Sequence, residues 1–177
     1  IGHDNRKEGR TAAWIIAQTA KKPGKVGIIV GTHRYLCQET AESSFRSYFR
    51  EHANGFRLLE PLVNLEDSRI AYEATLDMME KNPDLVGLYI CGGGMDGVIE
   101  AAREEATHDP VVVVCNELTE ATRSGLIDGI LSAVISTRTA TVAEKTVEAM
   151  ARMLESPATA LPAQIFVPFD LFIAENI

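Results

Sequence analysis

The sequence predicts an α/β fold in which helices cover both faces of a parallel sheet. Two observations lead to this prediction. Short apolar runs that suit buried strands alternate with segments whose apolar residues recur at helical spacing. Glycine, proline and asparagine separate these segments, as they do where helices and strands end. Strands that alternate with helices along a chain form parallel sheets, and the connecting helices pack on the faces of such sheets.

The first half of the chain predicts three helices, each followed by a strand. The first helix begins at Asp4 or Asn5 and the third at Asp67 or Ser68, because these side chains accept hydrogen bonds from the first backbone amides of a helix. Helix-ending pairs follow at Pro23-Gly24, Asn54-Gly55 and Asn82-Pro83. The strands are predicted at residues 25–31, 56–63 and 85–91. The apolar stripes of the helices include Ala12, Ala13, Ile16 and Ala20, then Ala41, Phe45, Tyr48 and Phe49, then Ala71, Ala74 and Met78.

The second half continues the alternation. Three glycines at 92–94 lead into a helix, and the plainest strand of the sequence follows at 111–115. A long helix at 139–155 carries an apolar face, and Pro168 predicts that the last strand-like segment lies at a sheet edge, because proline cannot donate a ladder hydrogen bond. The remaining predicted segments are a short helix at 120–127, a strand at 130–136, a linker at 157–162 and the edge strand at 164–173.

Composition excludes several classes of function. The chain has 17 basic and 25 acidic residues, a net charge of −8, and no basic stripe of the kind that nucleic-acid binding requires. No apolar run approaches the roughly 18 residues that span a bilayer. The three cysteines form no CxxC pair and have no histidine at ligand spacing, so we expect no disulfide framework and no metal site. A reduced, cytoplasmic setting fits this cysteine usage.

One glycine motif allows an alternative function. Residues 92–97 satisfy G-x-G-x-x-G between a strand and a helix, and Glu117 lies where the ribose-binding acid of a dinucleotide fold would lie. A phosphate could approach the amides at such a helix N-terminus. Three adjacent glycines match this pattern easily, however, so the motif has low specificity. Two βα units also precede it. A nucleotide-binding enzyme is therefore the less favoured interpretation, and we expect no cofactor.

Polar residues follow each predicted strand. The carboxyl ends of parallel strands share one edge of a sheet, and ligands of open α/β folds bind there. Acid, amide, hydroxyl and guanidinium groups at one rim suit a polyhydroxylated ligand. They include no evident pair of nucleophile and base, so we expect no catalytic residue. These rim residues are His33, Arg34 and Tyr35, then 64–66, Gly92, Asn116, Glu117, Thr137 and Arg138.

The order of these elements resembles the second lobe of type 1 periplasmic sugar-binding proteins and of lac-repressor-family regulators. Several motifs carry the resemblance, and they span nearly the whole chain. They are Gly2-His3-Asp4-Asn5, Gly9-Arg10-Thr11-Ala12-Ala13, residues 31–45, Asn82-Pro83-Asp84, the segment 111–116 and Ile127-Asp128-Gly129.

The resemblance implies a cleft whose ligand positions in this lobe are Ala41, Leu65, Gly92, Asn116 and Thr137. Sugar-binding members usually carry arginine, an aromatic residue, asparagine, aspartate, and glutamine or aspartate there. Asn116 keeps a similar polar group and Thr137 a smaller one, whereas Ala41 lacks the guanidinium that forks onto sugar hydroxyls. Arg34, Tyr35 and Arg138 are candidates for the missing donors.

The resemblance also implies a division of the chain. Residues 1–137 would form the C-terminal lobe of an effector-binding domain, 138–160 a helix of the other lobe, and 161–177 a returning segment. The chain then looks truncated, and the uncovered face of the long helix predicts self-association into a homodimer.

The favoured interpretation is the sugar-sensing domain of a cytoplasmic LacI-family transcriptional regulator, which would contact operator DNA only through a missing N-terminal domain and would not contact a membrane. The alternative is a periplasmic solute-binding protein of a transporter.

Overall fold

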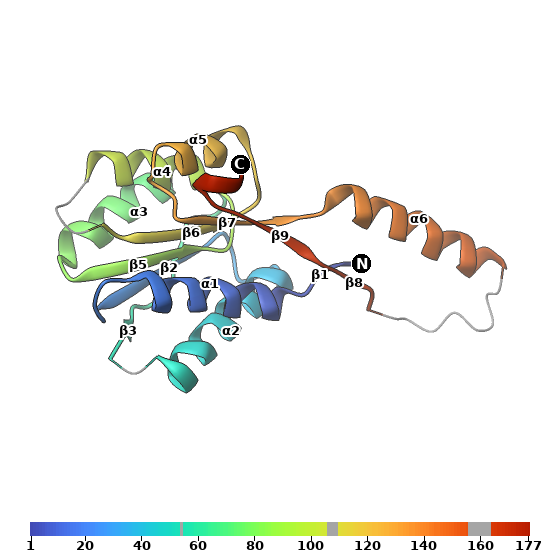
Figure 1. The fold of residues 1–177 in the computed structure, drawn as a ribbon, viewed down its shortest axis with the longest axis horizontal. Helices are drawn as coiled ribbons and strands as arrows, with labels where there is room; N and C mark the ends of the chain where they lie inside the picture. The colour runs from blue at the N-terminus through green and yellow to red at the C-terminus, as the bar shows by residue number, and fades with distance from the viewer. Residues whose placement is uncertain (54, 106–109, 156–163) are drawn as a thin grey trace.

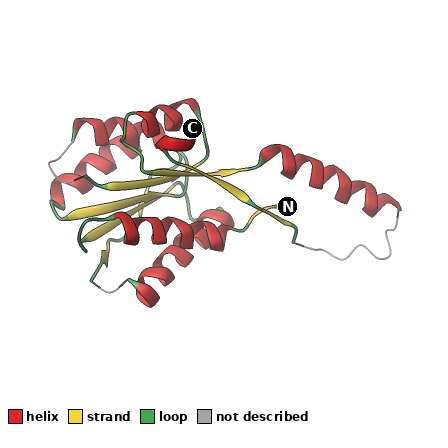
Figure 2. Ribbon diagram, viewed as in Figure 1, coloured by secondary structure: helices red, strands yellow, loops and turns green. Residues whose placement is uncertain are grey.

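A seven-stranded sheet runs through the molecule in the order β3-β2-β5-β6-β7-β9, and β4 also pairs with β2 (Figures 1 and 2). The computed structural model describes residues 1–53, 55–105, 110–155 and 164–177. Strands β2 to β7 all pair in parallel, and β9 runs antiparallel to β7. The long strands are β2 (Lys25–Val30), β5 (Leu85–Ile90), β6 (Val112–Asn116), β7 (Ala133–Thr137) and β9 (Phe169–Phe172). The predicted α/β fold is confirmed.

Helices cover the two faces of the sheet (Figure 1). One face carries α1 (Asn5–Thr19) and α2 (Leu36–His52). The other carries α3 (Ser68–Lys81), α4 (Met95–Glu104) and α5 (Glu120–Ile127). The sheet is thus buried on both sides, which explains why its central strands read as continuous apolar runs.

The side chains of the central strands alternate between the two helical layers. Val112 and Val114 pack in the cluster with α1 and α2, whereas Val113 and Cys115 pack in the cluster with α3, α4 and α5. This alternation follows from the two-residue repeat of a strand. The parallel register then brings the carboxyl ends of β2, β5, β6 and β7 to one edge of the sheet.

Two predicted helix caps are present. The carboxylate of Asp4 accepts hydrogen bonds from the backbone amides of Arg6 (3.0 Å) and Lys7 (3.3 Å) at the start of α1. Asp67 accepts from the amides of Arg69 and Ile70, both at 2.9 Å, at the start of α3. Each carboxylate satisfies amides that have no partner inside the helix and lies at the positive end of the helix dipole.

The predicted strand 56–63 is two short strands instead. β3 (Arg57–Leu58) and β4 (Leu62–Val63) both pair with β2, and the segment between them contains Pro61. Proline has no backbone N–H and cannot continue the ladder. Pro168 has the same effect at the end of the chain, where it separates β8 (Phe166–Val167) from β9. β8 pairs with β1 (Gly2–His3), and β9 is the edge strand that the sequence predicts. The predicted linker 157–162 and Asn54 lie outside the described residues.

Helix α6 (Thr139–Glu155) projects away from the sheet and its covering helices (Figure 1). None of its residues is buried, and Val147, Met150 and Leu154 are 67%, 60% and 82% exposed. The predicted apolar face therefore exists and lies uncovered. Neither α6 nor any other helix in the described residues has the length and hydropathy needed to cross a membrane.

Candidate functional site

A cavity of about 480 Å³ lies where the carboxyl ends of the strands meet the first turns of α1 and α2. It is open to solvent and mixes polar side chains with a few apolar ones. Its residues come from β1, α1, α2, the ends of β5, β6 and β7, and the start of α6. They are Ile1, Gly2, His3, Asn5, Glu8, Cys37, Gln38, Cys91, Gly92, Asn116, Glu117, Thr137 and Val142. Its position is the one that the strand-end rule predicts for a ligand site.

The floor of this cavity is built around the buried carboxylate of Glu8, which is 1% exposed. Oε1 accepts a hydrogen bond from the Tyr89 hydroxyl at 2.7 Å and another from Nδ2 of Asn116. Oε2 accepts from Nδ2 of Asn5 at 2.8 Å and pairs with Nε2 of His3. A carboxylate has room for about four such bonds. Glu8 is therefore fully satisfied, as a buried charge must be.

His3 connects Glu8 to the end of β7. Its Nδ1 lies 2.9 Å from Oγ1 of Thr137, and the Thr137 hydroxyl donates its proton to Oε1 of Glu117 at 2.5 Å. Since that proton is already used, Nδ1 of His3 must donate to Thr137, while Nε2 donates to Glu8. This pattern favours the imidazolium form of His3, paired with the Glu8 carboxylate and donating to the Thr137 hydroxyl.

The same surroundings shift the titration of His3. The hydrogen bond with Glu8 raises the pKa of His3 above its ordinary value of 6.5, against the opposing effect of burial, and the charges of Glu8, Glu117 and Asp4 raise it further. Because folding raises this pKa, protonated His3 stabilises the fold below about pH 6.5, and the contribution is lost as pH rises through the raised value.

We expect the His3→Gln variant to lose this pH dependence. In the wild type, the free energy of unfolding should fall as pH rises from about 6 through the raised pKa, whereas the variant should show a flatter profile. At low pH the variant should be less stable by about 1.5–3 kcal/mol, the contribution of a hydrogen bond to a charged group. Urea denaturation at a series of pH values measures both effects, with His52→Gln, at an exposed position at the end of α2, as the control. An equally steep profile in His3→Gln would contradict the assignment.

Left-handed backbone conformations gather in two loops at this edge of the sheet. Leu65 (φ 55°) and Glu66 (φ 64°) follow β4, and Glu117 (φ 64°) follows β6; they are the non-glycine residues with positive φ in the described chain. Such conformations cost about 1–3 kcal/mol each and persist where surrounding contacts enforce them. For Glu117 those contacts include hydrogen bonds from the amide (3.1 Å) and hydroxyl of Thr137.

The glycine loop 92–94 receives a carboxylate from the chain itself. Oε2 of Glu66 accepts a hydrogen bond from the Gly93 amide, and Oε1 accepts from Nε2 of Gln38 at 2.6 Å. A Cβ at Gly93 would lie 2.1 Å from Glu66 Oε2, and one at Gly31 would lie 1.7 Å from Oε1. The glycines therefore make room for Glu66, which fills the position that a phosphate would need. The geometry gives no support to the nucleotide-binding alternative.

The structure brings together part of the predicted rim. Gly92, Asn116 and Thr137 line the cavity. His33, Arg34 and Tyr35 are exposed on the loop before α2 and are not among the residues that line it. The loop nevertheless contacts a residue that lines the cavity, because the Thr32 amide donates a hydrogen bond to Oε1 of Gln38 at 2.9 Å.

The other predicted ligand positions lie elsewhere. Ala41 is 1% exposed and faces α1, where a Cβ at Gly9 would come within 2.1 Å of the Ala41 carbonyl oxygen. This placement speaks against a ligand contact by Ala41, and Gln38, one turn earlier on α2, lines the cavity instead. Leu65 is 66% exposed and is not among the residues that line the cavity. Arg138 is engaged with Asp170, whose Oδ1 accepts from its Nε at 2.7 Å.

Sequence reasoning missed the centre of the site. It gave no role to Glu8, Tyr89 or Gln38, and used His3 only as part of a resemblance. One signal was present: Glu8 lies four residues before Ala12, so an acidic side chain falls on the apolar stripe of α1. A charge at a core position is rarely buried unless it is paired.

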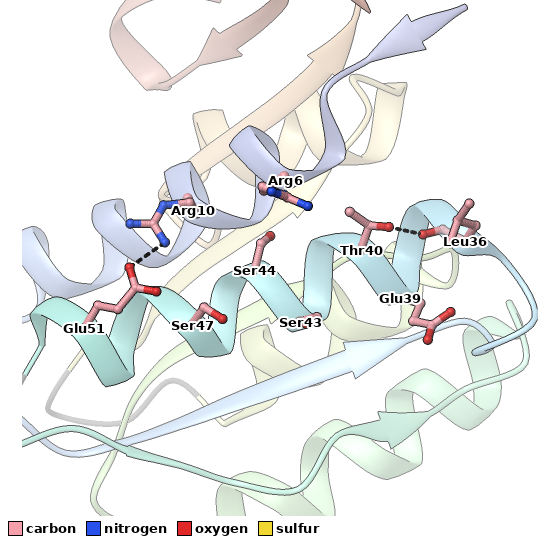
Figure 3. A pocket seen from close by; sticks show the side chains of 9 residues that line it. All are labelled: Arg6, Arg10, Leu36, Glu39, Thr40, Ser43, Ser44, Ser47 and Glu51. Atoms are coloured by element: carbon pink, nitrogen blue, oxygen red, sulfur yellow. Dashed lines mark hydrogen bonds and ion pairs between the residues drawn. The ribbon is translucent and has the colours of Figure 1, made fainter. Parts of the chain in front are cut away.

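A second pocket of about 430 Å³ lies between α1 and α2 (Figure 3). Two of its charged groups pair with each other, because Nη1 of Arg10 donates to Glu51 at 2.9 Å. The Thr40 hydroxyl likewise donates to the Leu36 carbonyl at 2.6 Å. This pocket lies along two helices, away from the strand ends that converge on the first cavity. We therefore take the cavity around Glu8 as the candidate ligand site.

The described residues include no cluster of histidine, cysteine or acidic side chains arranged to hold a metal ion. Burial raises the pKa of the Cys115 thiol to about 12, and that of the buried Cys91 thiol is raised as well, first by burial and then by the charge of Glu8. Neither is a reactive thiolate near neutral pH. The arrangement is suited to binding and orienting a polar molecule.

Comparison with known proteins gives a consistent result. A family model described as a periplasmic binding protein domain matches residues 1–158. Among solved structures, the glucose-galactose binding protein GanP from Geobacillus stearothermophilus superposes with a TM-score of 0.89 at 18% identity over 99% of this chain and 62% of its own. The arabinose binding protein AraP from the same organism superposes with a TM-score of 0.87 at 17% identity, over 99% of this chain and 62% of its own.

A periplasmic ribose ABC transporter structure from Conexibacter woesei gives a TM-score of 0.86 at 21% identity, over 98% of this chain and 58% of its own. The chain thus spans about three fifths of the length of these neighbours. No curated protein sequence matches it.

Proposed function

Because the chain belongs to the periplasmic binding protein domain family, we propose that it binds a sugar-like small molecule in the cavity around Glu8 and serves as the solute receptor of a transporter. Its role would be binding without catalysis. The structural neighbours support the class of ligand, since they are named as proteins that bind or transport glucose, galactose, arabinose or ribose. A cavity of about 480 Å³ lies within the roughly 300–1,000 Å³ range of small-molecule sites.

The observation that carries the proposal is the convergence of Gly92, Asn116 and Thr137 on one cavity. They stand at the ends of three different strands, yet the Glu8–His3 network joins the last two through hydrogen bonds. Side chains that are held in place before the ligand arrives lose little conformational entropy on binding. The network therefore supports a preorganised binding surface.

We further propose that this cavity is one wall of a cleft between two lobes. Residues 1–137 would form this wall, 138–160 would belong to the opposite lobe, and 161–177 would return to this one. The projection of α6, which has no buried residue, supports this division. The pairing of β1 with β8 beside it also supports it, because these strands lie where the chain leaves the sheet. Ligand binding would then shift the lobes toward a closed state.

A second candidate function is the effector-sensing domain of a LacI-type regulator. The observation in its favour is the absence of disulfides in the described chain: Cys91 and Cys115 are buried free thiols, and Cys37 is an exposed one. Free thiols of this kind are common in reducing compartments. The gene sequence upstream of residue 1 separates the candidates, since a signal peptide supports the receptor and a helix-turn-helix supports the regulator.

Calorimetric titration with neutral sugars tests the proposed binding. We expect at least one of glucose, galactose, arabinose and ribose to bind, and Asn116→Leu to weaken that binding by roughly 10- to 100-fold, the cost of about 1–3 kcal/mol for losing a polar partner in a ligand site. Ser43→Ala, in the pocket between α1 and α2, is the matched control and should leave the affinity unchanged. Failure of every sugar to bind, or an unaffected Asn116→Leu variant, would refute the proposal.

A further inference from the structure

We infer that the cavity selects ligands that offer hydrogen-bond donors and carry no negative charge, so that it accepts neutral and amino sugars and rejects uronates and sugar phosphates. This inference rests on the proposed sugar binding and narrows it to a chemical class. It follows from the direction of the hydrogen bonds that the protein already makes at this site, and from the sign of the charges around it.

Donors on the floor of the cavity are directed at carboxylates of the chain. Nδ2 of Asn116 donates to Glu8. The hydroxyl of Thr137 donates to Glu117 at 2.5 Å, and the backbone amide of Thr137 donates to the same carboxylate at 3.1 Å. The amide and hydroxyl of Thr137 and one of the two N–H groups of the Asn116 side chain are therefore already engaged inside the protein.

Donors at the rim are engaged in the same way. The Gly93 amide donates to Glu66, and Nε2 of Gln38 donates to Glu66 at 2.6 Å. The amide of Thr32 donates to Oε1 of Gln38 at 2.9 Å. An anionic group at the glycine loop would have to displace the Glu66 carboxylate from the Gly93 amide.

One acceptor oxygen on the cavity floor remains for the ligand. Within the described part of the chain, Oδ1 of Asn116 has one contact, at 3.4 Å from the Tyr89 hydroxyl, and the proton of that hydroxyl points to Glu8 at 2.7 Å. The Asn116 carbonyl oxygen is therefore available as an acceptor. Sugar hydroxyls and an ammonium group can donate to such oxygens, whereas an ionised carboxylate or phosphate only accepts.

The charges around the cavity act in the same direction. Glu8 and Glu117 line it, and Glu66 lies at its rim, against one imidazolium at His3. No lysine or arginine is among the described residues that line the cavity, and the nearby Arg138 is paired with Asp170. A ligand anion would thus enter a site of net negative charge, where partial exclusion of water strengthens the repulsion.

Three sugars with the same ring but different charge test the inference. Galactose, galactosamine and galacturonate, and the corresponding glucose series, are titrated into the 177-residue chain near pH 6, where the amine is protonated and the uronic acid is ionised. We expect the neutral and amino sugars to bind and the uronate to bind at least about tenfold more weakly than the neutral sugar. A uronate that binds as tightly as its neutral counterpart would overturn the inference while leaving sugar binding intact. Failure of all the sugars to bind would overturn the proposed function, and the inference with it.

Two charge-neutralising variants provide the matched comparison. Glu117→Gln removes one charge at the cavity and should reduce the discrimination against the uronate several-fold. Glu60→Gln removes one charge from a side chain that is 95% exposed and does not line the cavity, and it should leave the discrimination unchanged. The glutamine keeps a side-chain oxygen that can accept a hydrogen bond from Thr137, so this variant is expected to fold. If both variants alter discrimination equally, overall charge rather than the cavity is responsible, and the inference fails.

Discussion

We expect the Glu8→Ala variant to lose about 3–5 kcal/mol of the free energy of unfolding. Removing one partner of a buried charge pair leaves the other uncompensated, and its cost has this magnitude. Here the loss would strand the His3 imidazolium together with the Tyr89 hydroxyl and the Asn116 amide, all of which donate to Glu8. Since native domains are stable by only about 5–15 kcal/mol, the variant should be partly unfolded at modest urea concentrations.

Chemical denaturation at constant pH measures the effect of Glu8→Ala. The matched control is Glu60→Ala, which removes the same side chain from a position that is 95% exposed and holds a loose 3.8 Å pair with Arg46. That change should cost at most about 0.5–1 kcal/mol. Tyr89→Phe, which removes a single donor to Glu8, should fall between the two. Equal stability of Glu8→Ala and the control would show that the buried network contributes nothing.

The second large effect concerns the exposed face of α6. We expect the 177-residue chain to self-associate through Val147, Met150 and Leu154, because a contiguous apolar stripe exposed to water is stabilised by burial against a second copy. Met150→Asp combined with Leu154→Asp should convert the associated form to a monomer, since each carboxylate would have to be desolvated in the interface.

Sedimentation velocity at increasing protein concentration measures this association. Arg152→Asp is the control: it also adds negative charge to α6, but it lies off the apolar stripe and disrupts only an exposed 3.7 Å ion pair with Glu148. The control should associate as the wild type does. A wild-type chain that stays monomeric at high concentration would show that α6 does not act as a contact surface between copies.

Much of the scaffold could be predicted from the sequence because the determinants are local. The apolar runs of β2, β5 and β6 and the capping residues Asp4 and Asp67 act within a few residues of the chain. The prediction of a single strand at 56–63 was wrong, because it gave too little weight to Pro61, which divides this segment into two short strands.

The site could be predicted only in outline, because its chemistry is assembled from distant parts of the chain. The strand-end rule correctly brings Gly92, Asn116 and Thr137 to one edge of the sheet. It does not indicate that Glu8, at the start of a helix, reaches Tyr89 and Asn116 on the face of the sheet that this helix covers. It also does not distinguish Ala41, which faces α1, from Gln38 on the same helix, because that difference depends on how α1 and α2 pack.

Nuclear magnetic resonance of the isotope-labelled chain during titration with a neutral hexose is the sharpest test of sugar binding in the cavity around Glu8, because it locates even weak binding. We expect the backbone amide shifts to concentrate at Gly92, Asn116, Glu117 and Thr137, around the Glu8 cavity. Shifts confined to residues 43–47, in the pocket between α1 and α2, or no shifts at saturating sugar, would contradict this expectation.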